Sequence, residues 1–191
     1  MSRIIGGQGK GRRLRTPAGD ATRPTGARVR QTLFDILAPR IPGCRFLDAF
    51  AGSGGVGLEA LSRGADVVVL VDLSAAAIAA LRENVRLLSG ARGLARVYQQ
   101  DARVVLAGLA RAGETFDVIY LDPPYDSDLY EPLLEIVGAK GLLASGGAAV
   151  AEHFKKKALP ETIGSLACTR EAKVGDHRLS FYRQATLGVG E

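Results

Sequence analysis

The sequence predicts an α/β protein whose seven-stranded, mostly parallel sheet ends in an antiparallel hairpin. From residue 44 onward, short apolar runs that end in Asp alternate with segments long enough to form a crossover helix. The apolar run 67–71 is uninterrupted, as in strands buried on both faces, so we expect helices on both sides of the sheet. Two alternating runs, 166–174 and 177–184, flank Gly175, which is typical of a tight hairpin turn.

The individual elements follow from local patterns. Strands are expected in CRFLDAF, VVVLVD, ARVYQQD and FDVIYLD, and a fifth near 148–153. A helix is expected after Asp72, with Ser74 as its N-cap, and another around 129–137. The apolar residues of the first of these helices are spaced by three or four positions and share one face: Ile78, Leu81, Val85 and Leu88.

The first forty residues differ in character from the rest. A Gly/Arg-rich stretch over 3–17 has the potential to form a hairpin, and TGARVRQTLFDIL predicts a helix capped by Thr25. The apolar face of that helix should pack on the main domain. We therefore divide the chain into a basic N-terminal hairpin and helix, 1–40, and a domain over 41–191.

The distribution of charged residues divides the chain into the same two parts. The chain of 191 residues has a net charge of +5, but residues 1–40 hold nine Lys/Arg against two Asp, a surplus of +7 that leaves −2 for the remainder. This asymmetry is expected of an arm that binds a polyanion such as nucleic acid, and a merely solvated terminus is the alternative. The basic residues are Arg3, Lys10, Arg12, Arg13, Arg15, Arg23, Arg28, Arg30 and Arg40.

The cysteines, the apolar runs and the histidines argue against several kinds of site and of protein. Cys44 and Cys168 are far apart and lie in no metal-binding motif, so we expect free thiols, no metal site and a reducing, cytoplasmic environment. No apolar run resembles a signal peptide or a membrane span. His153 and His177 lack a neighbouring nucleophile motif and are interpreted as a strand-end residue and a hairpin residue.

A glycine-rich loop follows the first predicted strand. Gly52-Ser-Gly54-Gly-Val-Gly57 fits the G-x-G-x-x-G pattern of a dinucleotide site, and Asp72 follows Gly52 by 20 positions, the spacing of a ribose ligand. Glycine here allows a ligand to approach the backbone, which does not separate a nicotinamide cofactor from S-adenosylmethionine (SAM).

Three acidic residues end the first three predicted strands and should meet at one crevice. Asp72 suits the ribose hydroxyls, Asp101 the adenine amino group, and Asp48 a methionine ammonium; their alternative role is to cap helices. Leu73 and Ala102, the residues after two of these acids, are assigned to the same cofactor site. Because Asp48 would repel a pyrophosphate but attract a cation, the set favours SAM, and the closing hairpin is typical of SAM-dependent methyltransferases.

The fourth predicted strand ends in Asp122-Pro123-Pro124-Tyr125. Two prolines form a rigid corner, so Asp122 and the Pro123 carbonyl can accept hydrogen bonds from an exocyclic amino group while Tyr125 stacks on the base. A turn that only ends the strand is the alternative. Together with the glycine loop, this corner predicts methyl transfer to an amino group of a base.

Four segments together closely resemble the bacterial RsmD-type methyltransferases: DAFAGSGGVGLEALSRGA, DPPY, RIIGGQGKGRRL and TRPTGARVRQTLFDIL. The resemblance implies a class I SAM-dependent methyltransferase fold of Rossmann-like topology, SAM as the cofactor, and methylation of N2 of a guanine of 16S ribosomal RNA, guanine 966 in the standard rRNA numbering. It implies that Arg23, Thr25, Arg28 and Arg30 face RNA or shape the site, beside phosphate contacts expected from Arg12, Arg13 and Arg15. Gln31 departs from the family pattern, where glutamate is expected.

Several questions stay open at this point. The substrate is either free 16S rRNA or a 30S subunit or assembly intermediate, and a monomer is expected. An adenine-N6 methyltransferase acting on DNA or RNA also uses a DPPY corner, and a non-catalytic RNA-binding protein with a methyltransferase-like core is the alternative outside enzymes. A nicotinamide oxidoreductase is the least favoured interpretation.

Overall fold

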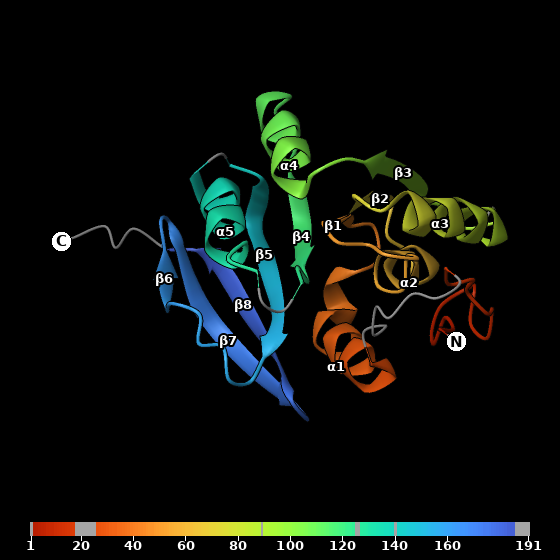
Figure 1. Ribbon diagram of the computed structural model, residues 1–191, viewed down its shortest axis with the longest axis horizontal. Coiled ribbons are helices and arrows are strands. Elements are labelled where there is room, and N and C mark those ends of the chain that lie inside the picture. Colours follow the sequence, from red (N-terminus) through yellow and green to blue (C-terminus); the bar gives the residue numbers. More distant parts are fainter. Residues whose placement is uncertain (1, 18–25, 89, 125–126, 140, 186–191) are drawn as a thin grey trace.

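A computed structural model describes residues 2–17, 26–88, 90–124, 127–139 and 141–185 (Figure 1). It contains one sheet of eight strands in the order β3-β2-β1-β4-β5-β8-β7-β6. The strands are β1 (Arg45–Asp48), β2 (Val67–Asp72), β3 (Leu94–Gln99), β4 (Phe116–Leu121), β5 (Leu143–Phe154), β6 (Thr162–Ile163), β7 (Leu166–Val174) and β8 (His177–Gln184). The helices are α1 (Ala27–Leu37), the 3-10 turn Ala38–Arg40, α2 (Gly57–Ser62), α3 (Ala75–Leu87), α4 (Ala102–Arg111) and α5 (Tyr130–Ala139).

The direction of winding changes between β1 and β4. Strands β1 to β5 are parallel, and the chain runs outward from β1 through β2 to β3 before it returns to β4 on the other side of β1. The carboxyl ends of β1 and β4 therefore lie side by side at the switch point, where open α/β sheets bind their ligands. The last three strands pair antiparallel.

Helices cover both faces of the sheet, as the continuous apolar strands predict. One buried cluster joins α1, α2 and α3 to the sheet through Leu33, Leu58 and Leu81. The other joins α4 and α5 to the opposite face through Leu106 and Leu134. Successive residues of the central strands are buried in one cluster and then in the other, and this alternation fixes the register of these strands.

The N-terminal arm, residues 2–17, forms a hairpin with an isolated antiparallel bridge between Arg3 and Arg13. It lies beside α2 and α3 (Figure 1), where the backbone N–H of Gln8 donates to the Ser62 carbonyl at 2.8 Å. The following helix packs on the domain as predicted, since Val29, Leu33 and Leu37 are buried and the Phe34 ring stacks on Phe46 of β1.

Local predictions are mostly confirmed. Gly175 takes a φ of 62° in the turn between β7 and β8, Ser74 caps α3 by accepting from the Ala77 N–H at 3.3 Å, and the cysteines are free.

Two details of the prediction were wrong. The sheet has eight strands rather than seven, because β6 is only two residues long and has no detectable period. The N-cap of α1 is Gly26, without a side-chain bond, rather than Thr25, which lies outside the described residues. No helix in the described ranges is long and apolar enough to cross a membrane.

Candidate active site

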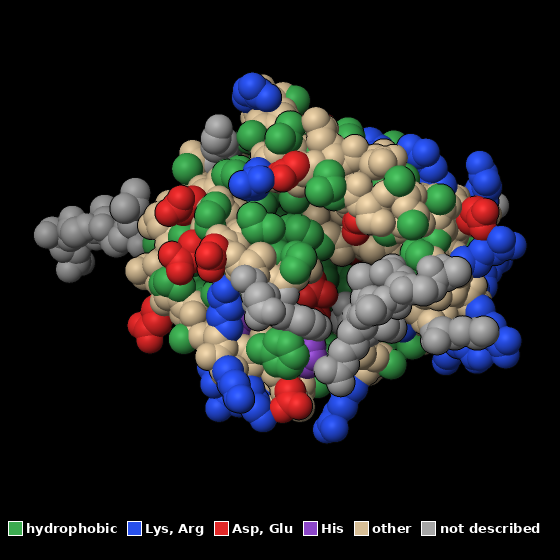
Figure 2. Space-filling view, in the orientation of Figure 1, with side chains coloured by type: hydrophobic (Ala, Val, Ile, Leu, Met, Phe, Trp, Pro, Cys, Tyr) green, Lys and Arg blue, Asp and Glu red, His purple; other side chains and the backbone are tan. Residues whose placement is uncertain are grey.

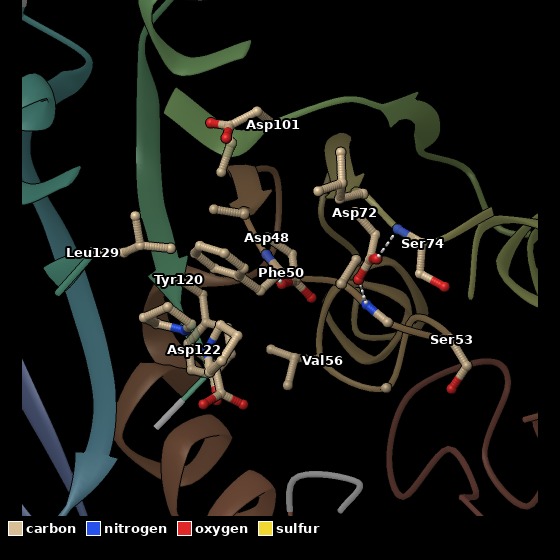
Figure 3. A pocket seen from close by; sticks show the side chains of 18 of the residues that line it. Asp48, Phe50, Ser53, Val56, Asp72, Ser74, Asp101, Tyr120, Asp122 and Leu129 are labelled. Atoms are coloured by element: carbon tan, nitrogen blue, oxygen red, sulfur yellow. Dashed lines mark hydrogen bonds between the residues drawn. The ribbon is translucent and has the colours of Figure 1, made fainter. Parts of the chain in front are cut away.

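A pocket of about 1020 Å³ opens at the carboxyl ends of the central strands. It is lined from β1, β2, β4, the glycine loop and the start of α4 (Figure 3), which are the elements that the sequence assigned to one crevice. From outside, the same region is a hollow rimmed by hydrophobic side chains with acidic atoms at its base (Figure 2). Asp48, Asp72, Asp101 and Asp122 all line it.

Asp72, at the end of β2, organises the glycine loop. One carboxylate oxygen accepts from the Gly52 N–H and the other from the Ser74 N–H, both at 2.8 Å (Figure 3). Gly52 has a φ of 54°, and a Cβ at this position would meet no atom within 4 Å. The backbone at Gly52 therefore borders open space in the pocket, as a close ligand approach requires.

Gly54 has a packing role in the loop. It does not line the pocket, and a Cβ there would lie 2.5 Å from Leu81 and 2.6 Å from Leu58. Its φ of 94° also disfavours a side chain. Close packing of the loop against α2 and α3 thus explains the need for glycine at position 54, and the cofactor contact predicted for it stays a prediction.

Asp48, at the end of β1, is 1% exposed and still lines the pocket. Its carboxylate accepts from the Gly57 N–H at 2.9 Å and more weakly from the Phe50 N–H at 3.4 Å. Burial raises the pKa of Asp48 to about 7, while these two hydrogen bonds lower it and the nearby Asp72 and Glu152 raise it further. The pocket thus contains a carboxyl group that titrates near neutrality and would be stabilised in its ionised form by a cation.

Asp101 caps α4 and is paired with Arg103. It accepts from the Arg103 N–H and from its guanidinium, both at 2.8 Å, and this pairing lowers the pKa of Asp101. The helix-capping alternative for Asp101 is therefore correct, while its position in the pocket wall leaves the cofactor role open. Leu73 is 70% exposed and Ala102 is buried; both line the pocket.

The end of β4 brings the predicted acceptor corner to the same pocket. Asp122 and Pro123 line it, together with Tyr120, whose side chain lies on the same face of the strand as Asp122 (Figure 3). Tyr125, predicted to stack on the base, lies outside the described residues. The acids predicted to bind the cofactor and the corner predicted to bind a base therefore line the same pocket.

The predicted RNA-contacting cations divide into two groups. Arg12, Arg13, Arg15 and Arg28 are exposed, with Arg15 paired to Glu83 of α3 at 2.7 Å. Lys and Arg gather on the side of the molecule where the arm and α3 lie (Figure 2). Arg23 and Thr25 lie outside the described residues.

Arg30 is only 3% exposed and points inward. Its guanidinium donates to the Ser2 hydroxyl at 2.8 Å, the Arg3 carbonyl at 2.6 Å and the Gly55 carbonyl at 3.4 Å. A direct phosphate contact by Arg30 does not fit this burial, and the structure instead assigns it to the residues that shape the pocket.

Some pocket residues were missed by sequence reasoning. Phe50 and Gln100 line the pocket beside the predicted acids, which adjacency to Asp48 and Asp101 could have indicated. Asn84, which does not line the pocket, could not have been found in this way, because its partners are distant in sequence. It is fully buried, pairs with the backbone N–H and C=O of Arg15, and donates to the Ser53 carbonyl at 2.8 Å, so it links the arm to the glycine loop.

Comparisons with known proteins identify the family. Residues 2–183 match the family described as Conserved hypothetical protein 95. The chain is 36% identical to Ribosomal RNA small subunit methyltransferase D of Escherichia coli, over 99% of this chain and 93% of that protein. It is 39% identical to the YlbH protein of Bacillus subtilis, over 95% and 98%. The chain belongs to the RsmD family of methyltransferases.

Solved structures agree with this assignment. The structure of the YhhF protein of Escherichia coli superposes with a TM-score of 0.82 at 37% identity, covering 95% of this chain and 97% of that one. A hypothetical protein of Thermus thermophilus gives 0.81 at 39%, covering 95% and 98%. The sheet with its antiparallel end is thus the class I methyltransferase fold that the sequence predicted.

Membership of the family implies SAM, and the pocket fits it. The open space at Gly52, the Asp72 carboxylate beside it and the exposed Leu73 offer contacts for a nucleoside, and Asp48 suits an ammonium group. Across the residues that the structure describes, no group of three or more His, Cys, Asp or Glu side chains could hold a metal ion.

Proposed function

We propose that this protein transfers a methyl group from SAM to the exocyclic N2 of a guanine in 16S ribosomal RNA, guanine 966 in the standard numbering. The observation that carries the proposal is that the acidic residues suited to the cofactor and the Asp122-Pro123 corner line one pocket. A transfer reaction requires its two substrates to meet in such a shared space. The rRNA substrate is supported by the name of the Escherichia coli relative.

The cofactor half of the pocket would hold SAM with three acidic side chains. Asp72 accepts hydrogen bonds from the ribose hydroxyls, Asp101 accepts from the adenine amino group beside its bond to Arg103, and Asp48 faces the methionine ammonium. Leu73 and Ala102 provide apolar contact for the adenine. SAM supplies the methyl group when it is bound.

The acceptor half would hold the base. The amino group of guanine is a weak nucleophile because its lone pair is delocalised into the ring. Asp122 and the Pro123 carbonyl accept hydrogen bonds from its two N–H groups, which favours the geometry in which the lone pair can attack the methyl group. Tyr125 stacks on the base. Asp122 also stabilises the positive charge that develops on the amino group. Because the base must leave its stack to reach this corner, an unpaired guanine is the expected target.

The exposed cations of the arm would bind the RNA backbone. Arg12, Arg13 and Arg15 lie on a hairpin that Asn84 connects to the glycine loop, so RNA held there would be close to the pocket. Arg28 adds a further positive charge to this surface, and the family motif assigns Arg23 and Thr25 to it. Such contacts are independent of base sequence and give a strong dependence on salt.

Nucleoside analysis of small-subunit rRNA from cells with and without the gene tests the proposal. Loss of one N2-methylguanosine on deletion, restored by the wild-type gene but not by an Asp122→Ala variant, is the expected result. An unchanged nucleoside profile, or loss of N6-methyladenosine instead, would contradict it. The same cells indicate whether free RNA or an assembled particle is used, if the modification is assayed in 16S precursors and in 30S subunits. A cytoplasmic monomer remains our proposal for the form of the enzyme.

A further inference from the structure

A buried polar cluster adjoins the acceptor corner. Glu152 of β5 is completely buried, and one of its carboxylate oxygens accepts a short hydrogen bond from the Tyr120 hydroxyl. The other oxygen lies 3.0 Å from Nδ1 of His177, at the start of β8. Tyr130 donates from its hydroxyl to the backbone carbonyl of Glu152 at 2.9 Å. Side chains of β4 and β8 therefore meet the buried carboxyl group of Glu152, and a side chain of α5 binds its backbone carbonyl.

Burying this polar cluster in the interior of the sheet costs free energy. Removing a carboxylate from water costs several kcal/mol unless partners compensate, and apolar side chains of similar size usually stabilise a core at least as well. Burial accordingly raises the pKa of Glu152. Stability alone does not account for a carboxyl group here, whereas its partner Tyr120 lines the pocket.

Tyr120 connects the cluster to the pocket. It lies on β4, and Asp122 follows it by two residues, just after the strand ends, so both side chains point to the same side and both line the pocket (Figure 3). Burial and the negative charges of Glu152, Asp122 and Asp48 raise the pKa of Tyr120 well above its usual value. Its hydroxyl therefore stays protonated and remains a hydrogen-bond donor to Glu152.

We propose that Glu152 is a positioning residue for methyl transfer: through the Tyr120 hydroxyl it fixes the pocket wall that adjoins Asp122, and His177 supports it from the other side. The inference rests on the function proposed above. A phenol ring held at its far end by a buried acceptor cannot rotate away from the corner, whereas a ring without that acceptor is held only by packing. Because Glu152 itself does not line the pocket, its loss should affect turnover rather than SAM binding.

Three variants test this role. Glu152→Leu removes the acceptor, and we expect kcat with RNA to fall by about tenfold or more while the Kd for SAM changes by less than about twofold. Glu152→Gln keeps a carbonyl oxygen for Tyr120 and an amide for His177, so it should restore most of the activity. Tyr120→Phe should reproduce the loss, and combining it with Glu152→Leu should add little, because both changes break the same contact.

Tyr182 offers a matched control. It is also a buried tyrosine of the sheet, but its hydroxyl donates to the Pro160 carbonyl at 2.8 Å, away from the pocket. Tyr182→Phe should therefore leave kcat unchanged. Should Glu152→Leu fail to fold, Tyr120→Phe and Glu152→Gln decide the question on their own.

Two results would overturn the inference: a folded Glu152→Leu or Tyr120→Phe protein with wild-type kcat, or a loss of kcat and SAM affinity together that Glu152→Gln does not rescue. The second result would assign the cluster to stability alone. Failure of the proposed function gives a different outcome, because then the wild type itself would form no N2-methylguanosine in the RNA, and the inference would be wrong as well.

Discussion

Replacing Asp48 by asparagine should stabilise the protein at neutral and alkaline pH. Folding raises the pKa of Asp48 from 3.8 to about 7, because its carboxyl group is buried at the end of β1. A group whose pKa is higher in the folded state favours folding at low pH and loses that contribution as the pH rises through the folded value. The shift corresponds to about 4 kcal/mol of destabilisation once Asp48 is fully ionised.

Asparagine retains the main contact at this position. Its side-chain oxygen can accept from the Gly57 N–H, the stronger of the two bonds made by Asp48, and only the 3.4 Å bond to the Phe50 N–H is given up. The difference in the free energy of unfolding between Asp48→Asn and the wild type should therefore increase in favour of the variant by about 2.5 kcal/mol between about pH 5 and about pH 8.

Urea denaturation of both proteins without SAM, repeated across that pH range, measures this difference. Asp128→Asn changes an exposed carboxyl group and serves as the control for removing one negative charge. A difference between Asp48→Asn and the wild type that does not vary with pH would show that the pKa of Asp48 is not raised by folding. SAM should bind the variant more weakly, by about 1–3 kcal/mol, because a neutral amide replaces the acceptor proposed for the ammonium group.

Three further predictions concern cofactor, base and RNA. Asp72→Ala should weaken SAM binding by about 1.5–3 kcal/mol in calorimetry, since it removes charge-assisted hydrogen bonds to the ribose and the anchor of Gly52. Asp122→Ala should lower kcat by at least about a hundredfold in a methyl-transfer assay while SAM still binds. Neutralising Arg12 and Arg13 should flatten the dependence of RNA affinity on salt by about two units of slope in filter-binding titrations, with SAM affinity unchanged.

Controls for these variants are available within the chain. Arg111 of α4 and Lys173 of β7 are exposed cations outside the arm, and their double substitution should change the salt slope less than the arm variant does. An equal effect of the two double variants would show that the arm contributes only net charge. Tight binding of a nicotinamide dinucleotide without binding of SAM would contradict the assignment of Asp72, and full turnover by Asp122→Ala would contradict that of the corner.

Local periodicity in the sequence predicted most of the helices and strands. The strands β7 and β8 were predicted with their observed bounds, because alternation and a turn glycine are properties of neighbouring residues. The crevice followed from one topological rule, that parallel strands bring their carboxyl ends together, which placed Asp48, Asp72 and Asp122 in one pocket. Each strand end is recognised within a short window of sequence, and the topological rule then brings these ends together.

Contacts between distant residues could not be predicted in this way. Arg30 has the same residue type and motif position as an exposed phosphate ligand, and only the tertiary structure shows that it is buried against Ser2 and Arg3. Gly54 fits the cofactor fingerprint although packing against α2 and α3 explains it. The contact between Tyr120 and Glu152 joins residues 32 positions apart on neighbouring strands, with no local pattern to indicate it.

A methyl-transfer assay in vitro tests the proposed reaction itself. Unmodified small-subunit rRNA and 30S particles would each be incubated with SAM labelled in its methyl group, with wild-type protein and with Asp122→Ala, then digested to nucleosides and separated. We expect label in N2-methylguanosine with the wild type and a loss of nearly all of it with Asp122→Ala. Label in N6-methyladenosine, or in no nucleoside from either substrate, would contradict it.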